Sequence, residues 1–259
     1  MIIVVSDVHL GYDLSDETSF KNFLFNYVSE TLSSDDHFVL LGDILDFWRR
    51  KNIDTLLENN TILEKIFALA TNVHYIVGNH DYYMLTIKER FPEYQSLDLR
   101  KYLRLEDAES KFFFIHGYEL DVFANYEPLT LEEYEEISEN LCQTGNTIGR
   151  IFDILWGVGR KLQKPPDKRK SWRRKKGLRP SPIHHMSNLE KFACSPCRNL
   201  LLGLKKDEKL VFGHTHNPFI NENTANSGSW VKEGFEYDTF IQIEDGRMEK
   251  KRWIGEKVA

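Results

Sequence analysis

The sequence predicts an α/β protein in which two facing mixed β-sheets are flanked by helices and interrupted by a helical, lid-like insertion. Three observations carry this prediction. Short continuous apolar runs are typical of strands buried on both faces. Amphipathic stretches separate the first of these runs, and the C-terminal part alternates as antiparallel strands do.

The N-terminal part is predicted to open as β-α-β-α-β. Residues 16–32 and 56–70 carry apolar side chains at helical spacing, which indicates core-facing helices between strands. Their core-facing positions are Phe20, Phe23, Leu24, Tyr27 and Val28 in the first helix, and Leu63, Ile66, Phe67 and Ala70 in the second. The strands are the apolar runs at residues 2–5, 38–41 and 73–77.

The C-terminal part has a different pattern. Apolar runs at residues 112–115 and 210–212 predict two more buried strands. Alternation over residues 235–244, an Asp245-Gly246 turn and residues 247–254 then predict an antiparallel pair. Two mixed sheets accommodate both the parallel opening and this antiparallel end.

Polar residues of metal-ligand type follow all five apolar runs. In open α/β sheets, ligands bind beyond the carboxyl ends of the strands, so these side chains are expected to meet at one edge. The residues are Asp7 and His9; Asp43 and Asp46; Asn79, His80 and Asp81; His116; and His214 and His216.

The ligand types indicate divalent cations. Carboxylate oxygen, imidazole nitrogen and one amide carbonyl suit manganese, iron or zinc, whereas a thiolate set would indicate structural zinc, and no cysteine lies in these clusters. Two ions about 3.5–4 Å apart that share a carboxylate can hold a phosphoryl oxygen and generate hydroxide near neutral pH. Asp43 is the natural bridging ligand.

The motif order DxH, GDxxD, GNHD, HG and GHTH closely resembles the calcineurin-like metallophosphoesterase superfamily. The resemblance runs from Ile2 to about Trp230, except for one long insertion. It implies the two-sheet fold and a dinuclear centre. By that resemblance Asp7, His9, Asp43 and His216 would hold one metal, and Asp43, Asn79, His116 and His214 would hold the second, with His80 outside the coordination shell.

His80 is the expected catalytic histidine. A protonated imidazole beside the metals can stabilise charge on phosphoryl oxygens and pass a proton to the leaving oxygen, typically about 10²–10⁴-fold in rate. Asp81 is a plausible partner that orients its ring. Asp46 has two alternatives, a hydrogen-bond partner behind the ligands or a residue at the N-terminus of a helix.

Residues 120–204 are predicted to be the insertion, which leaves residues 1–119 and 205–259 as the catalytic domain. The first part of the insertion is acidic and has the spacing of a helix with one packed and one solvated face. The glutamates are Glu127, Glu132, Glu133, Glu135, Glu136 and Glu139, and the apolar residues are Leu129, Leu131, Tyr134, Ile137 and Leu141.

The next part of the insertion is strongly basic. Residues 150–179 hold twelve Lys or Arg against two Asp, a local net charge of +10 in a chain whose total is −6. An apolar stripe over residues 148–162 leads into it. This pattern suits an anionic membrane surface or a lipid-like substrate, an amphipathic helix packed on the catalytic domain with a solvated tail, or nucleic acid. The candidate substrate-binding residues are Trp156, Arg173, Arg174, Lys175 and Lys176.

Within the superfamily, several runs are similar to the UDP-2,3-diacylglucosamine hydrolase branch, a manganese-dependent pyrophosphatase with a lid over acyl chains. They are residues 6–11, 42–48, 116–120 and 213–218, with a helical insertion between the last two. The chain departs from that branch at His80, where the branch has Arg, and at Tyr118, where it has Asp. Basic residues 49–51 also replace the acidic residues that the branch has after Trp48.

These observations together predict a phosphoesterase with two divalent ions, most simply Mn²⁺, that acts on a phosphoester or pyrophosphate of an amphipathic substrate. A nuclease and a catalytically silent interaction scaffold are the alternatives. Composition is ordinary for a globular protein, with 29% charged and 41% hydrophobic residues. No secretory signal or spanning stretch is evident, so a cytoplasmic protein is expected, with peripheral contact at the inner face of the membrane.

The cysteines do not predict a disulfide framework. There are three, Cys142, Cys194 and Cys197, and an odd number without a secretory signal favours reduced, partly buried thiols. The lone CxxC at residues 194–197 could form an irregular zinc site only with His184 and His185 upstream.

Overall fold

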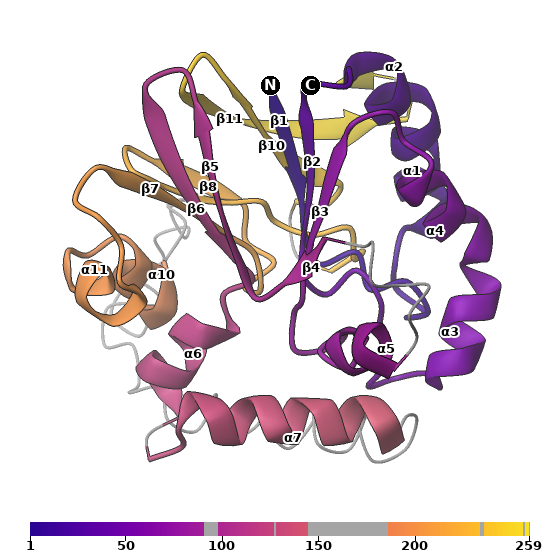
Figure 1. Cartoon of the computed structure of the whole chain (residues 1–259), viewed down its shortest axis with the longest axis horizontal. Coiled ribbons are helices and arrows are strands. Elements are labelled where there is room, and N and C mark those ends of the chain that lie inside the picture. Colours follow the sequence, from indigo (N-terminus) through magenta and orange to yellow (C-terminus); the bar gives the residue numbers. More distant parts are fainter. Residues whose placement is uncertain (91–97, 127, 145–185, 234–235, 256, 259) are drawn as a thin grey trace, which may run out of the picture.

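The computed structural model of the chain describes residues 1–90, 98–126, 128–144, 186–233, 236–255 and 257–258. Two β-sheets face each other, and helices cover their outer sides (Figure 1). The predicted α/β architecture of two mixed sheets flanked by helices is confirmed.

The first sheet has seven strands in the order β12-β11-β10-β1-β2-β3-β4. The strands β1, β2, β3 and β4 are parallel to one another, and β10, β11 and β12 add an antiparallel half beside β1. The bounds are β1 Ile2–Val5, β2 His37–Leu41, β3 Asn72–Ile76, β4 Leu99–Arg100, β10 Thr239–Glu244, β11 Arg247–Ile254 and β12 Lys257–Val258.

The second sheet has five strands in the order β5-β6-β7-β9-β8. Its centre is parallel, from β6 through β7 to β9, and each edge is antiparallel. The bounds are β5 Tyr102–Asp107, β6 Ser110–Ile115, β7 Glu208–Phe212, β8 Phe219–Asn221 and β9 Thr224–Asn226.

The predicted helices are present, with local differences. The first comprises α1 Glu17–Asn22, a π-helical segment η1 Phe23–Val28 and α2 Ser29–Thr31. The second is broken at Asn59 into α3 Asn52–Glu58 and α4 Asn60–Phe67, and Phe67, expected in the core, is 38% exposed. The others are α5 Met84–Arg90, α6 Tyr118–Asn125, α7 Leu131–Thr144, α10 Asn188–Ala193 and α11 Cys197–Leu202.

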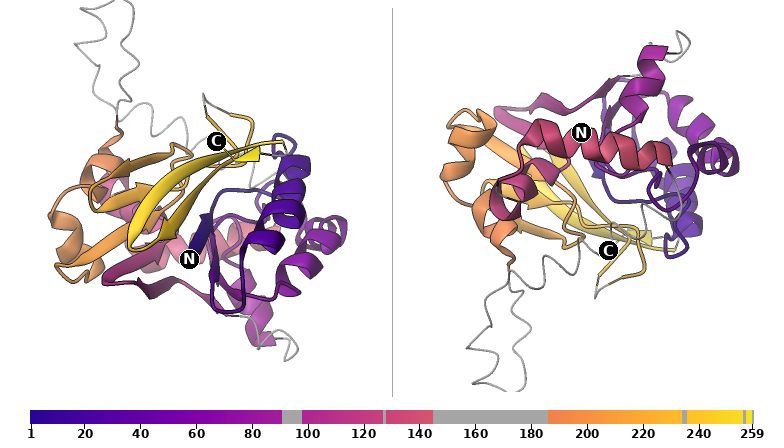
Figure 2. Two further views of the ribbon diagram at one scale, coloured as in Figure 1. Left: turned by 90° about the horizontal axis from the view of Figure 1, so that it is seen from above. Right: turned by 90° about the horizontal axis from the view of Figure 1, so that it is seen from below.

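The side chains of a single strand enter two different cores. In β1, Ile2 and Val4 pack between the sheets, while Ile3 and Val5 face the helices that follow β1 and β2. A third core lies between the second sheet and α6 and α10. Seen from above in Figure 2, α10 and α11 lie on one side of the paired sheets and the helices between β1 and β3 lie on the other. Each apolar run is therefore buried on both faces, as its composition predicts.

The described ends of the predicted insertion pack into the same cores. Tyr134, Leu141 and Cys142 of α7 join the core of the first sheet, and α7 crosses beneath α5 and α6 (Figure 1). Glu135 was expected on the solvated face, but it is buried. Hydrogen bonds that it accepts from the Tyr118 hydroxyl and Lys101 compensate its carboxylate for the loss of water. No helix among the described residues is long and apolar enough to cross a membrane.

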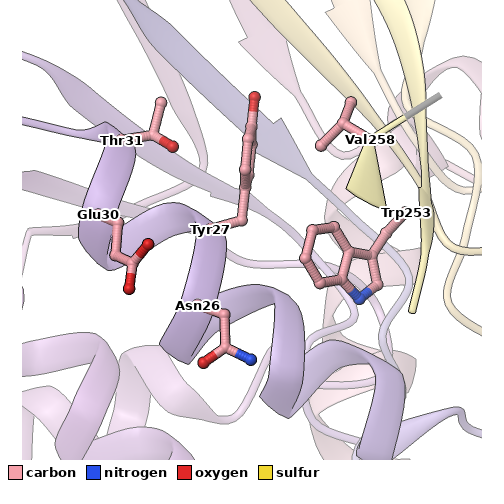
Figure 3. A pocket seen from close by; sticks show the side chains of 6 residues that line it. All are labelled: Asn26, Tyr27, Glu30, Thr31, Trp253 and Val258. Atoms are coloured by element: carbon pink, nitrogen blue, oxygen red, sulfur yellow. The ribbon is translucent and has the colours of Figure 1, made fainter. Parts of the chain in front are cut away.

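A surface pocket lies between η1, α2 and the C-terminal strands (Figure 3). The rings of Tyr27 and Trp253 form its wall with centroids 5.9 Å apart, and the Tyr27 hydroxyl donates to Gln242 Oε1. None of the predicted ligands lines it; its lining residues are Asn26, Tyr27, Glu30, Thr31, Trp253 and Val258.

Candidate metal centre

The predicted ligands come together at the carboxyl ends of β1, β2, β3, β6 and β7, so strands of both sheets contribute. Backbone hydrogen bonds join the loops that carry them. The amide of Asp7 donates to the Gly42 carbonyl at 3.0 Å, and the amide of Gly213 donates to the His116 carbonyl at 2.8 Å. In Figure 1 these strand ends face α5, α6 and α7.

One group consists of Asp7, His9 and His216, and His9 also belongs to a group with Asp43 and His80. Asp7 Oδ1 lies 3.2 Å from His216 Nε2 and 3.9 Å from His9 Nε2, and His9 Nε2 lies 3.7 Å from Asp43 Oδ2. The two imidazole Nε2 atoms are only 3.3 Å apart. Nitrogen lone pairs at that separation repel unless a proton or a cation lies between them.

A second group forms around the same oxygen of Asp43. Its Oδ2 lies 3.1 Å from His116 Nε2, and His214 offers a further ring nitrogen within 4.8 Å of the Asp43 and His116 ligand atoms. Asn79 stands in the same loop as His80, whose amide donates to Asp43 Oδ1 at 2.8 Å. Asp43 thus faces both groups, as a bridging ligand must.

Three buried atoms at this site make no hydrogen bond of good geometry: Asp7 Oδ1, Asn79 Oδ1 and His116 Nε2. The approaches of Asp7 Oδ1 to His216 and of His116 Nε2 to Asp43 are close in distance only. Leaving a buried polar atom without a partner costs about 1–3 kcal/mol. Three such atoms in one site, all oxygen or imidazole nitrogen, are what divalent cations would satisfy. The residues therefore fit a dinuclear metal centre.

The backbone at the ligands is strained. Five of the seven predicted ligands have positive φ, between 52° and 64°: Asp7, His9, Asp43, His214 and His216. This left-handed region costs a non-glycine residue roughly 1–2 kcal/mol. Such strain persists only where the surrounding structure imposes it, and here it turns the ligand side chains toward one another.

Glycines before the ligands leave the space that the ligands occupy. A Cβ at Gly42 would lie 2.3 Å from His116 Nδ1, and one at Gly78 would lie 2.1 Å from Asp43 Oδ1. Gly42 also has φ of 84°, which a side chain rarely adopts. These glycines are therefore required by the approach of the two loops.

Hydrogen bonds behind the histidines fix which ring nitrogen faces the site. His116 Nδ1 lies 2.9 Å from the Leu41 carbonyl, which can only accept, so in the neutral ring the proton is on Nδ1 and Nε2 carries the lone pair. His9 Nδ1 lies 3.0 Å from Asp46 Oδ2, which likewise directs Nε2 inward. Both rings thus present Nε2 to Asp43.

The site concentrates negative charge. Burial opposes ionisation of Asp43, but His116, His80 and His9 hold the pKa of that carboxyl well below its usual value. Burial also opposes a charge on His116, yet Asp43 and Asp7 raise the pKa of that imidazole to about 10. The carboxylates that favour a proton on His116 would favour a dication in the same place.

His80 is held by Asp46, and the expectation that Asp81 orients it is wrong. His80 Nδ1 lies 3.2 Å from Asp46 Oδ1, and its ring stacks on Trp48 with centroids 4.2 Å apart. Burial lowers the pKa of His80, but Asp46 and Asp43 outweigh it and raise that pKa above its usual value.

Asp81 acts on the loop backbone instead. Its carboxylate accepts from the amides of Gly78 and Ile44 at 2.7 and 2.8 Å and from the Tyr75 hydroxyl at 2.6 Å. Burial and the neighbouring Asp43 raise the pKa of Asp81 to about 6. Of the two alternatives for Asp46, the structure shows the hydrogen-bond partner behind the ligands, because its carboxylate contacts His9 and His80. No helix begins at Asp46; its Oδ1 also accepts from the Arg49 amide in a turn.

Two further contacts were not anticipated. Asp121 Oδ2 lies 3.0 Å from His214 Nε2, and Cys142 Sγ donates to the carbonyls of Asn79 and His80 at 3.6 and 3.3 Å. A carboxylate one helical turn into the segment after HG was the only signal for Asp121. Nothing in the sequence pairs residue 142 with the GNHD loop.

The other predicted sites lie outside the described residues or outside the metal-type clusters found among them. Trp156, Arg173, Arg174, Lys175 and Lys176 lie outside the described residues. Cys194 is partly buried and Cys197 is exposed, and the metal-type clusters among described residues do not include them. His184 and His185, the other half of that possible zinc site, also lie outside the described residues.

The chain was compared with protein families, curated proteins and solved structures. The profile of a family described as calcineurin-like phosphoesterase matches residues 1–218. A search of the curated proteins found no match. Among solved structures, a dimetal phosphatase from Danio rerio is similar at 14% identity and a TM-score of 0.48, covering 99% of this chain and 97% of that one. A cold-active protein-tyrosine phosphatase from Shewanella has 14% identity and a TM-score of 0.47, covering 100% and 79%.

Proposed function

The chain belongs to the calcineurin-like phosphoesterase family and is a metal-dependent phosphoesterase, and we propose that it hydrolyses a phosphoester or pyrophosphate bond of an amphipathic, nucleotide-linked or lipid-like substrate at a dinuclear centre. The observation that carries the proposed dinuclear centre is the position of Asp43 Oδ2, which lies 3.7 Å from His9 Nε2 and 3.1 Å from His116 Nε2.

The proposed first metal position consists of Asp7, His9, Asp43 and His216, and the second of Asp43, Asn79, His116 and His214. Two divalent ions bound there would supply positive charge to the phosphoryl oxygens and acidify the attacking water. We expect Mn²⁺, with iron or zinc as alternatives, because the donors are carboxylate, imidazole and amide without thiolate.

His80 is the proposed catalytic acid or charge-stabilising group. Asp46 and Asp43 favour its protonated form, and Asp46 holds Nδ1, so Nε2 is the atom that would meet the substrate. A proton on that nitrogen can stabilise the phosphoryl oxygens and then pass to the leaving oxygen. Stacking on Trp48 keeps the ring in one orientation.

Residues 120–204 are the proposed substrate-selecting element, and they include the segment between α7 and α10. Thr144, the last described residue before that segment, lies two residues beyond Cys142, whose thiol contacts the carbonyls of Asn79 and His80. On the other side of the segment is α10, where Glu190 Oε1 accepts from Asn217 Nδ2, next to the GHTH loop. Both ends of the segment are therefore attached to loops that carry ligands.

The amphipathic substrate is proposed from the sequence of that segment. Its apolar stripe with Trp156 and its basic run 173–176 suit acyl groups and phosphates respectively. Peripheral contact with an anionic membrane would follow from the same chemistry, at roughly 1 kcal/mol for each basic contact. A cytoplasmic location at the inner face of the membrane remains part of this proposal.

The deciding experiment compares three substrates with and without Mn²⁺: an aryl phosphodiester, a nucleotide pyrophosphate with an acylated sugar, and single-stranded nucleic acid. We expect Mn²⁺-dependent hydrolysis of the first two. Preferential cleavage of nucleic acid would favour the nuclease alternative. Hydrolysis of none of them, with metal bound, would favour the scaffold alternative.

A second experiment tests the selecting element. Trp156→Ala and a charge-neutralising replacement of residues 173–176 should each weaken binding to anionic lipid vesicles, and salt should weaken it further. Hydrolysis of the aryl phosphodiester should change little in either variant. Undetectable vesicle binding at low salt, together with cleavage of nucleic acid, would require the lipid-like substrate to be abandoned.

A further inference from the structure

A buried carboxylate outside the five motifs contacts one of the histidines of the second metal position. Asp121 in α6 is 1% exposed, and its Oδ2 lies 3.0 Å from His214 Nε2. Its Oδ1 accepts a hydrogen bond from Asn125 Nδ2 one turn further along α6. The carboxylate is therefore held at both oxygens while it faces His214.

The contact selects a ring nitrogen. An ionised carboxylate can only accept, so the proton of a neutral His214 ring lies on Nε2 and the lone pair lies on Nδ1. The other end of the residue is also held, because the His214 amide donates to Asp7 Oδ2 at 2.9 Å and its φ is 64°. Backbone and ring tip are thus both constrained, which leaves little freedom for the ring to turn.

The helix that carries Asp121 is itself anchored to the strands that deliver the ligands. Leu120 of α6 packs in one core with Phe113 and Ile115 of β6 and with Leu210 and Phe212 of β7. His116 follows β6 and His214 follows β7. The packing of α6 on β6 and β7 therefore holds Asp121 in a fixed position relative to both histidines.

We propose that Asp121 is a positioning residue for the second metal position, where it sets the tautomer and the orientation of His214 so that Nδ1 faces Asp43 and His116. This inference rests on the proposed dinuclear centre. The competing explanation is a plain ion pair between Asp121 and a protonated His214, which would oppose metal binding at that ring.

The test is an equilibrium Mn²⁺ titration of the full chain by calorimetry, with electron paramagnetic resonance to distinguish a spin-coupled pair from a single ion. Asp121→Ala should weaken the binding of the second Mn²⁺ ion by about 10–100-fold and leave the affinity for the first ion unchanged. Asp121→Asn keeps an accepting oxygen and should weaken the second ion less. Asp98→Ala is the matched control, because Asp98 pairs with His74 away from the ligands, and both affinities should stay as in the wild type.

The outcomes separate this inference from the proposed function. A second-ion affinity in Asp121→Ala that equals or exceeds that of the wild type, or a wild type that binds only one ion, would overturn it. If Asp121→Ala fails to fold, Asp121→Asn decides the question. A lower affinity for the second ion in Asp121→Asn supports the inference, and an unchanged affinity overturns it. A wild type that binds two ions without hydrolysing any phosphoester would refute the proposed activity alone.

Discussion

Replacing Asp46 by Asn tests how the charge of His80 is controlled. Asp46 Oδ1 lies 3.2 Å from His80 Nδ1, and both residues are buried. A charge pair at about that distance is worth about 5 kcal/mol at an effective dielectric constant of about 20. Burial of both charges offsets much of this, so loss of the Asp46 charge should lower the pKa of His80 by less than the Coulomb energy alone implies.

The pKa of His80 determines the direction in which the pH profile of turnover should move. Burial lowers that pKa, and Asp46 with Asp43 raises it above its usual value, so the protonated form persists to higher pH than in free histidine. Without the Asp46 charge the proton is lost at lower pH. We therefore expect the alkaline limb of the kcat profile to move to lower pH in Asp46→Asn.

The assay is turnover of an aryl phosphodiester against pH at saturating Mn²⁺, because Asp46 also holds His9 and its loss weakens the first ion. At alkaline pH, Asp46→Asn should lose about 10²-fold or more, approaching His80→Ala at about 10²–10⁴-fold. The double variant should be little worse than His80→Ala, because the two residues act as one unit.

Asp81→Asn is the matched control, because Asp81 bonds the backbone of Gly78 and Ile44 and does not contact His80. It should lower the melting temperature and leave the alkaline limb in place. An alkaline limb that stays unshifted in Asp46→Asn, with turnover within about threefold of the wild type, would refute the reasoning.

Three further predictions concern metals, packing and pH. Chelation should abolish hydrolysis, and Mn²⁺ should restore it better than Ca²⁺. Asp43→Asn should be the most damaging ligand change, because both ions lose a charged ligand. Full activity in metal-free protein would contradict this prediction. Gly78→Ala, whose Cβ would meet Asp43, should lower metal occupancy measured by elemental analysis, whereas Gly203→Ala, whose Cβ meets nothing within 4 Å, should not. Burial raises the pKa of Asp238 to about 6, so the folded state loses stability as pH rises through that value. Asp238→Asn should therefore raise the melting temperature near pH 8 and not near pH 3.5, and an equal change at both pH values would count against that cause.

The sequence by itself determined the layers of the fold and the composition of the ligand set. Strands buried on both faces appear as continuous apolar runs, because each successive side chain enters a different core; Ile2 and Ile3 are such a pair. The ligands follow those runs, so their convergence at the strand ends could be predicted without coordinates. The break at Asn59 and the exposure of Phe67 could not, because helical spacing alone does not locate a helix end.

Tertiary structure alone decided which carboxylate serves which histidine. Asp81 is adjacent to His80 in sequence, yet the GNHD loop turns its side chain toward the backbone of the loop after β2, and Asp46 from that loop reaches the ring instead. Asp121 reaches His214 across 93 residues of sequence because α6 is anchored on β6 and β7. A hydrogen bond depends on separations of about 3 Å, and only the packing of distant elements sets distances on that scale.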